Sequence, residues 1–216
     1  MTKSSCYDIM LTGGENLFED EFSHKGIDKA AQINKAMIDS NEYRRKFDNA
    51  TDNPKANKTL YDCAKEILYD RSGTRFESMR WIDGDTGEII AKFDQMGKSP
   101  ELSGEKNELK VSYNDSVLHK LAGHNNVIVL HNHPNSTAPS AGDFNAAYLY
   151  GYRTGFVAAH NGRLFKYSSN EMINENIYLK YWEHYAGIYF DELKAQEKAI
   201  EKISRNSNIT FKEVFK

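Results

Sequence analysis

The stretch Val127–Phe144 has the sequence VIVLHNHPNSTAPSAGDF and decides the fold that we expect for this chain. It opens with an apolar run, which is typical of a strand that is covered on both faces of a sheet. Two histidines, His131 and His133, follow with one residue between them, and Pro134 comes directly after. Because proline cannot donate to a sheet ladder, the strand should end there.

A helix is expected after a short polar loop. Ser140 has a side chain that helix N-caps favour, and Asp143 follows three residues later, as in a capping box. In that arrangement the carboxylate lies in the first helical turn and points back towards the loop. A buried strand that leads into a helix indicates an α/β layer.

The spacing of these side chains also predicts a metal site. His131 and His133 are two residues apart in an extended chain, so both rings point to the same face of the sheet. Imidazole is a common ligand of zinc, and Asp143 would add a carboxylate. Three protein ligands leave the fourth position for water, whose pKa zinc lowers towards about 7. The plainer interpretation is two polar residues at a strand end, followed by an ordinary capping box.

Patterns elsewhere divide the 216 residues into three expected regions. Residues 1–72 should be mainly helical, with helices over 27–47 and about 56–70. Residues 73–168 should form the α/β core, in which strands interleave with helices in a mixed sheet. Residues 169–216 should form a C-terminal helical extension.

Two hairpins and a short helix are expected inside the core. The letters GDTG join a strand over 74–83 to a strand over 88–93. An Asn-Gly pair joins two further strands within 154–168. The short helix should cover 112–123.

One long helix is expected over 170–203. An aromatic-rich stripe along its first half should pack in the core. The second half, DELKAQEKAIEKI, is rich in charged residues and should be solvated. The expected stripe consists of Ile173, Ile177, Tyr181, Tyr185, Ile188, Tyr189 and Leu193.

Composition limits the classes of function. The net charge is −3 and the basic residues are scattered, so nucleic-acid binding is not indicated. Cys6 and Cys63 lack C-x-x-C spacing, which argues against a disulfide framework, and Cys63 should be buried in a helix. We find neither a signal peptide nor an apolar run of about 18 residues, and therefore expect a cytoplasmic protein without a membrane span. The sequence carries no signal for the oligomeric state.

The letters HNHP at 131–134 and SAGD at 140–143 resemble the JAMM motif, H-x-H-P followed by S-x-x-D, of the JAB/MPN metalloproteases. The form is most similar to the bacterial and phage-type branch, and the resemblance covers roughly residues 73–168. Nine residues separate His133 from Asp143, one fewer than in the best-known members. The resemblance implies a cytidine-deaminase-like mixed sheet between helices, with Zn²⁺ held by the two histidines and the aspartate. It also implies cleavage of a peptide or isopeptide bond in a peptide or protein-conjugate substrate.

The family uses a glutamate upstream of the histidines as general base, and Glu77 is the residue that we expect in this role. Strand alternation in RFESMRWID places it on the same face as Met79 and Trp81. A carboxylate on such an apolar face is costly unless it has a partner or a function. The alternatives are Glu66, in the preceding helix, and Glu88, beside the hairpin turn. Both are more simply explained as solvated surface residues.

Ser140 has two alternative roles. The resemblance implies that its hydroxyl polarises the substrate carbonyl and stabilises the oxyanion. Alternatively, it acts only as the N-cap of the helix.

The alternative function is a catalytically silent scaffold or binding module of the JAB fold, in a phage or mobile-element assembly. Degenerate members usually lose a histidine or the aspartate, whereas this chain has all three ligands and a candidate base. A nucleobase deaminase would need H-x-E and P-C-x-x-C, and an HNH nuclease would need elements beyond the letters HNH. The remaining histidines are expected to be surface or packed residues: His24, His119, His124, His160 and His184.

Overall fold

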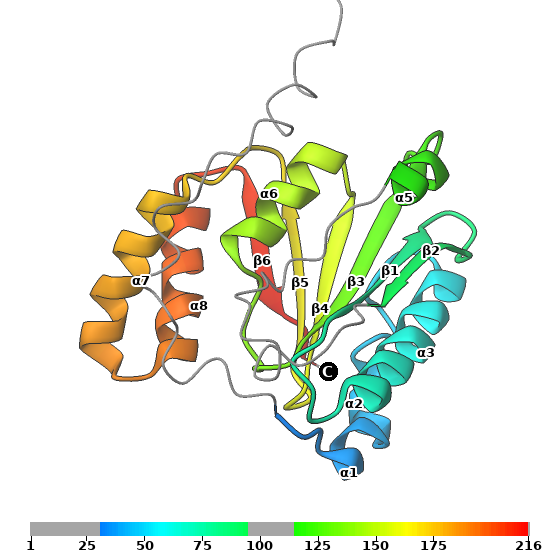
Figure 1. The fold of residues 1–216 in the computed structure, drawn as a ribbon, viewed down its shortest axis with the longest axis horizontal. Helices are drawn as coiled ribbons and strands as arrows, with labels where there is room; N and C mark the ends of the chain where they lie inside the picture. Colours follow the sequence, from blue (N-terminus) through cyan, green and yellow to red (C-terminus); the bar gives the residue numbers. More distant parts are fainter. Residues whose placement is uncertain (1–30, 95–114, 216) are drawn as a thin grey trace, which may run out of the picture.

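The structure is a computed structural model that describes residues 31–94 and 115–215. Several expectations lie outside these residues: Cys6, His24, the start of the first expected helix, and the start of the helix over 112–123. Within the described residues the fold is mixed α/β, with one six-stranded sheet in the order β2-β1-β3-β4-β5-β6 (Figure 1). The strands are β1 Ser78–Asp83, β2 Ile89–Asp94, β3 Val127–His133, β4 Thr154–Ala159, β5 Leu164–Ser169 and β6 Ile209–Glu213.

Helices cover both faces of this sheet (Figure 1). They are α1 Lys35–Ile38, α2 Asn41–Arg45, α3 Pro54–Arg71, α5 Asp115–Leu121, α6 Ala141–Tyr150, α7 Glu175–Tyr189 and α8 Glu192–Ser204. Pro54 occupies the first helical position of α3, where its missing N–H costs no hydrogen bond. Cys63 is buried in α3, as expected.

β3 is one of the two central strands of the sheet, and all seven of its residues are buried. It pairs with β1 in antiparallel orientation and with β4 in parallel orientation. The other neighbouring pairs in the sheet are antiparallel, so the sheet is mixed. The chain passes from β3 to β4 through α6, and both expected hairpins are present, as β1–β2 and β4–β5.

Alternate residues of β3 pack into two different cores. Ile128 and Leu130 face the side that is covered by α1 to α3. Val127 and Val129 face the side that α6 and α8 cover, where Phe144 is also buried. His131 and His133 continue the second set, because side chains alternate along a strand.

The prediction of a single helix over 27–47 is wrong, because the described part of this range contains two short helices, α1 and α2. Ser40 separates them. Its hydroxyl donates to the carbonyl of Met37 at 2.6 Å and accepts from the N–H of Tyr43 at 3.1 Å. One side chain therefore ends α1 and begins α2, which is the role that serine favours at a helix N-cap.

The prediction of one long helix over 170–203 is also wrong, because the chain forms two helices there and turns back between α7 and α8 (Figure 1). Phe190 has the left-handed conformation, with φ of 51°. The side chain of Asp191 then caps α8 by accepting from the N–H of Lys194 at 3.1 Å. The two helices pack against each other as a hairpin.

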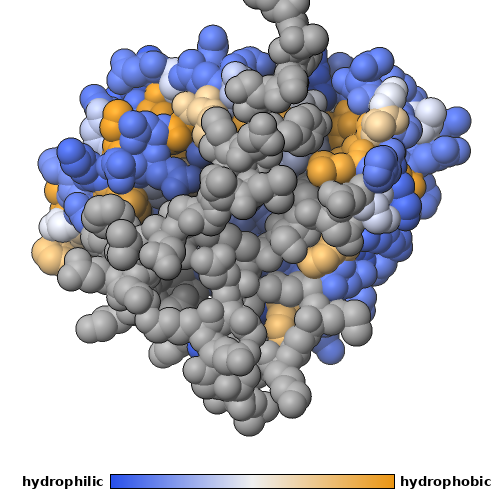
Figure 2. Space-filling model, turned by 45° about the horizontal axis from the view of Figure 1, so that its top comes forward, coloured by the Kyte–Doolittle hydropathy of each residue, from blue (hydrophilic) through white to orange (hydrophobic). Residues whose placement is uncertain are grey.

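The expected burial of these two halves is reversed. Ile173, the first residue of the expected stripe, lies before α7 and is buried, but α7 itself contains no buried residue, and Ile177 and Ile188 are half exposed. On the charged helix α8, Ala199, Ile200 and Ile203 are buried against the sheet core. In the coloured part of the face that Figure 2 shows, hydrophobic residues lie in small groups between hydrophilic ones.

The sixth strand, β6, has no counterpart in the expected helical extension. It pairs with β5 in antiparallel orientation and forms an edge of the sheet. Arg163, which precedes β5, binds Glu213 of β6 at 2.6 Å and also forms an ion pair with Glu197 of α8. This partly buried ion pair network ties the last strand and the last helix to the hairpin.

Candidate metal centre

His131 and His133 lie at the carboxyl end of β3, where their rings converge. Both side chains are buried, and their Nε2 atoms are 3.0 Å apart. The ring of Tyr167 packs edge-on against His131, with 6.3 Å between the ring centroids. The end of the strand therefore places two imidazole nitrogens side by side on the α6 face of the sheet.

Asp143 reaches the same point from the first turn of α6. Its Oδ1 lies 3.2 Å from Nε2 of His131, and its Oδ2 lies 3.5 Å from Nε2 of His133. Oδ2 also accepts from the backbone N–H of Ser140 at 2.6 Å, while Ser140 Oγ accepts from the N–H of Asp143. The capping box is thus present, and it leaves Oδ1 facing His131.

The nine-residue connection from His133 to Asp143 is long enough to close this arrangement. Ser136 adopts the left-handed conformation, with φ of 63°, and its Oγ accepts from the N–H of Asn161 at 3.0 Å. Gln196 of α8 donates to the carbonyl of Ala138 at 3.2 Å. The loop is therefore held by the β4–β5 turn and by the C-terminal helix.

The three side chains lie close enough together to hold one metal ion. Zinc lies about 2.0–2.2 Å from nitrogen and oxygen ligands, which places neighbouring ligands roughly 3.3–3.6 Å apart. The two Nε2 atoms are 3.0 Å apart, Oδ1 of Asp143 lies 3.2 Å from His131, and Oδ2, the other oxygen, lies 3.5 Å from His133. One ligand atom from each side chain lies within 4.8 Å of the other two. The group is a possible metal-binding triad, and its two nitrogens and one carboxylate suit Zn²⁺.

The tautomer of His133 is fixed by Thr137. Nδ1 of His133 lies 3.1 Å from the carbonyl of Thr137, which can only accept, so Nδ1 carries the proton. Thr137 Oγ1 lies 2.9 Å from the same nitrogen and donates its own proton to Asn135. The lone pair of Nε2 in neutral His133 is therefore directed at the triad, as a metal ligand requires. Nδ1 of His131 is buried and has no hydrogen-bond partner within the described residues.

The charges of the three side chains are strongly coupled. Burial lowers the pKa of His133, but the hydrogen bond and the charge of Asp143 outweigh it and raise the pKa to about 9. Burial opposes ionisation of Asp143, but the charge and hydrogen bond of His131 and the hydrogen bond of His133 hold its pKa well below the usual range. Without metal, the centre therefore contains an imidazolium next to a carboxylate.

Glu77 lies beside this centre, directly before β1. Burial raises the pKa of its carboxyl group, while the charges of His133 and His131 lower it. The charge of Asp143 raises it further, so the carboxylate lies within electrostatic reach of all three ligands. β1 begins at Ser78, so the expected strand over 74–83 is shorter than the sequence pattern indicates.

The two alternative glutamates lie elsewhere. Glu66 of α3 binds Arg80 at 3.0 Å and Lys92 at 3.3 Å. Arg80 is buried on the opposite face of β1 from Met79, whose partner in β3 is His131. Glu88 is exposed beside the β1–β2 turn.

Ser140 is the N-cap of α6, and its hydroxyl is fully engaged there. Oγ donates to Asp143 Oδ2 at 2.9 Å and accepts from the N–H of Asp143 at 3.2 Å. These contacts establish the capping role. A role towards an oxyanion requires the hydroxyl proton to turn away from Asp143.

The other histidines of the described residues are surface or packed residues, as the sequence predicts. His119 and His184 are exposed, and Nδ1 of His124 lies 2.6 Å from Asp83. His160 is fully buried and contacts Asn132. Sequence reasoning missed Thr137 and Asn132, although a buried amide on a strand covered on both faces must have hydrogen-bond partners.

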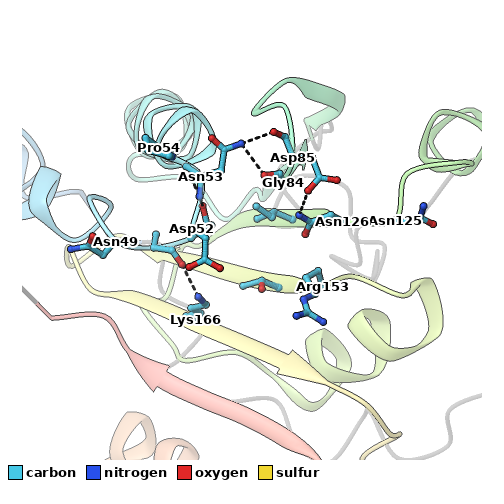
Figure 3. Close-up of a pocket in the computed structure, with 14 residues that line it drawn as sticks. Asn49, Asp52, Asn53, Pro54, Gly84, Asp85, Asn125, Asn126, Arg153 and Lys166 are labelled. Carbon is cyan, nitrogen blue, oxygen red and sulfur yellow. Dashed lines mark hydrogen bonds between the residues drawn. The ribbon is translucent and has the colours of Figure 1, made fainter.

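A polar groove of about 830 Å³ lies at the other end of β3, away from the histidines (Figure 3). Asn53 donates to the carbonyls of Gly84 and Asp85, and Asn126 donates to the carboxylate of Asp85. Lys166 donates to the carbonyl of Ala50 at 2.6 Å. These hydrogen bonds join the β1–β2 turn to the start of α3 and to the residue before β3, and β5 to the segment before α3. The groove is separate from the candidate metal centre.

Comparisons with protein-family models, with curated proteins and with solved structures find no match for this chain. Function must therefore be inferred from the site. None of the helices in residues 31–94 and 115–215 has the length and apolar character that crossing a membrane requires.

Proposed function

We propose that this protein is a zinc-dependent hydrolase of the JAB/MPN type, with the JAMM ligand set and the cytidine-deaminase-like core of the bacterial and phage-type branch. The observation that carries the proposal is the convergence of His131, His133 and Asp143 at the end of a buried strand. Glu77 within electrostatic reach of all three adds a candidate base. The bond cleaved is a peptide or isopeptide bond in a peptide or protein conjugate.

The three ligands would hold Zn²⁺, which would polarise a water molecule and lower its pKa towards about 7. The carboxylate of Glu77 would serve as the general base that accepts a proton from the attacking water as the water oxygen bonds to the amide carbon. Glu77 then gives the proton to the leaving amine as the C–N bond breaks. A raised pKa suits a group that must both accept and donate near neutral pH.

Asp143 and Ser140 have different roles in this proposal, metal binding and stabilisation of the oxyanion. Asp143 would hold the cation with its carboxylate, which the capping box with Ser140 keeps in place. The hydroxyl of Ser140 turns its proton from Oδ2 to the substrate carbonyl oxygen, where negative charge develops. Thr137 keeps the proton of His133 on Nδ1, so that Nε2 remains a ligand.

Metal analysis combined with a cleavage assay tests this proposal. Purified protein is supplemented with zinc, dialysed and analysed for bound metal, beside His131→Ala and Asp143→Ala. We expect about one zinc ion per wild-type chain and loss of binding in both variants. Cleavage is measured with a random peptide pool and with ε-linked lysine isopeptides, and new amino groups are identified by mass spectrometry.

Matched glutamate substitutions identify the base. Glu77→Gln should retain zinc and lose cleavage by about 10³-fold, because general-base catalysis contributes roughly 10²–10⁴. Glu66→Gln and Glu88→Gln should cleave like the wild type. A wild-type protein that holds no more zinc than the ligand variants would contradict the proposal. Bound zinc without any cleavage would instead support a catalytically silent scaffold.

A further inference from the structure

Asn132 lies between the two histidines, but its side chain points to the opposite face of β3. It is fully buried. Its Oδ1 accepts from the N–H of Ser78 at 2.8 Å, and its Nδ2 donates to the carbonyl of Phe76 at 3.2 Å. Nδ2 also lies 3.1 Å from Nε2 of His160.

The orientation of this carboxamide is fixed by its partners. A backbone N–H can only donate and a backbone carbonyl can only accept, so the oxygen of Asn132 faces Ser78 and its nitrogen faces Phe76. Nδ1 of His160 lies 2.7 Å from the carbonyl of Ala31 and must donate to it. Nε2 of His160 therefore accepts the second proton of the amide, and the network is mutually consistent.

The two backbone partners of Asn132 are the peptide groups on either side of Glu77. The Phe76 carbonyl belongs to the peptide before Glu77, and the Ser78 N–H belongs to the peptide after it. The ladder between β1 and β3 ends at the pair Met79–His131. Beyond that pair, the side chain of Asn132 replaces backbone pairing and holds both peptide planes that set the direction of the Glu77 side chain.

We propose that Asn132 is a positioning residue that fixes the Glu77 carboxylate relative to the two histidines by holding the peptide groups on both sides of Glu77. This inference rests on the proposed function of Glu77 as the base. The same strand then presents two ligands on one face and holds the base-bearing segment from the other face. A base must lie within hydrogen-bond reach of the proton that it takes, and a displacement of about 1 Å can cost 10²-fold in rate.

His160 holds the side chain of Asn132 in place through a hydrogen bond. Its ring links the amide to the carbonyl of Ala31, and the N–H of Ala31 donates to the carbonyl of Pro134 at 2.9 Å. Asn132 is therefore held in one rotamer by hydrogen bonds to groups other than the candidate metal ligands. Such support from neighbouring side chains is what keeps a reactive group in place.

The test uses Asn132→Leu, which has similar size but no hydrogen bonds, in full-length protein. We expect the amide hydrogen of Ser78 to exchange at least 10-fold faster, while zinc affinity stays within about threefold of the wild type. Cleavage of the random peptide pool should fall about 10²-fold in kcat, with little change in KM. Unchanged exchange of the Ser78 amide would overturn the proposal.

A double-mutant cycle with Glu77→Gln separates positioning from general damage. If Asn132 acts through Glu77, Asn132→Leu should cause no further loss of cleavage in the Glu77→Gln background. Independent, multiplicative losses would contradict the inference. Asn132→Asp keeps the shape and the acceptor for Ser78, so it takes the place of the leucine variant in the cycle if that variant does not fold.

Asn145→Leu is the matched control. Asn145 is also a buried amide that holds backbone, since it accepts from the N–H of Ile173 at 2.7 Å and donates to the carbonyl of Ile173. Its loss should lower stability without a selective loss of kcat. If wild-type protein neither binds zinc nor cleaves, the proposed function fails, whereas exchange at Ser78 still decides whether Asn132 holds the segment.

Discussion

The Nε2 atoms of His131 and His133 lie 3.0 Å apart in a buried site. Two nitrogen lone pairs at that distance repel each other unless a proton or a cation lies between them or close to both. The raised pKa of His133 and the lowered pKa of Asp143 indicate that a proton serves this purpose in metal-free protein. Zinc and protons therefore compete for the same atoms.

Zinc affinity should consequently rise with pH. The pKa of His133 in the metal-free fold is about 9, so zinc must displace one proton from it at neutral pH. We expect affinity to increase about tenfold per pH unit between roughly pH 6.5 and 8.5, and to level off above pH 9. Competition with a chromogenic chelator at constant ionic strength measures this. A flat profile below pH 8 would show that His133 is not the protonated group.

Removing the hydroxyl of Thr137 should weaken zinc binding. Thr137→Val keeps the carbonyl that accepts from Nδ1 of His133 but loses the contact at 2.9 Å through Oγ1. Outer contacts of this kind contribute about 10–100-fold to metal affinity, and we expect a loss of about tenfold. Thr210→Val, on the exposed side of β6, is the control and should bind zinc like the wild type.

Substitutions of Ser140 can separate capping from catalysis. Ser140→Ala should lower the free energy of unfolding by about 1 kcal/mol, because it removes the N-cap of α6. Ser140→Asn can still cap, so it should restore most of that stability. If the hydroxyl also stabilises the oxyanion, both variants should lose about 10²-fold or more in kcat. Full activity of the asparagine variant would leave capping as the only role.

The reversed burial of α7 and α8 predicts unequal effects of identical substitutions. Ile200→Ala on α8 should cost about 3 kcal/mol, because the side chain is fully buried in the core beside Ile203. Ile188→Ala on α7 should cost about 0.5 kcal/mol or less, because that side chain is 52% exposed. Urea denaturation of both variants makes the comparison. Equal losses would mean that α7 is as well packed as α8.

The convergence of His131, His133 and Asp143 could be predicted from the sequence because its signals are local. Strand periodicity fixes the faces of His131 and His133, and the cap fixes the direction of Asp143. The C-terminal region was less predictable. The break at Phe190 depends on a left-handed residue that has no sequence marker, and on α8 a narrow apolar stripe is hidden among charged residues. β6 has only five residues, and pairing with β5 determines it.

The contacts around Glu77 were beyond sequence reasoning for another reason. Alternation predicts that Glu77 lies on the same face as Met79, but β1 begins only at Ser78, after Glu77. What places Glu77 is a side chain from a different strand, Asn132, some fifty residues later in the chain. Such long-range hydrogen bonds have no periodic signature in a single sequence.

The two faces of β3 have different roles, because His131 and His133 lie on one face and Asn132 lies on the other. We therefore expect that β3 cannot gain or lose a single residue without loss of function. Inserting or deleting one residue before His131 would turn Asn132 towards α6 and both imidazoles towards α3. The candidate ligands and the positioning residue would then lie on the wrong faces of the sheet. A change of length in the loop from Pro134 to Pro139 turns no side chain to the other face of the sheet, because the cap of α6 sets the direction of Asp143 locally. Thr137 in this loop must still reach Nδ1 of His133. Gain or loss of a residue should therefore be tolerated better in the loop than in β3.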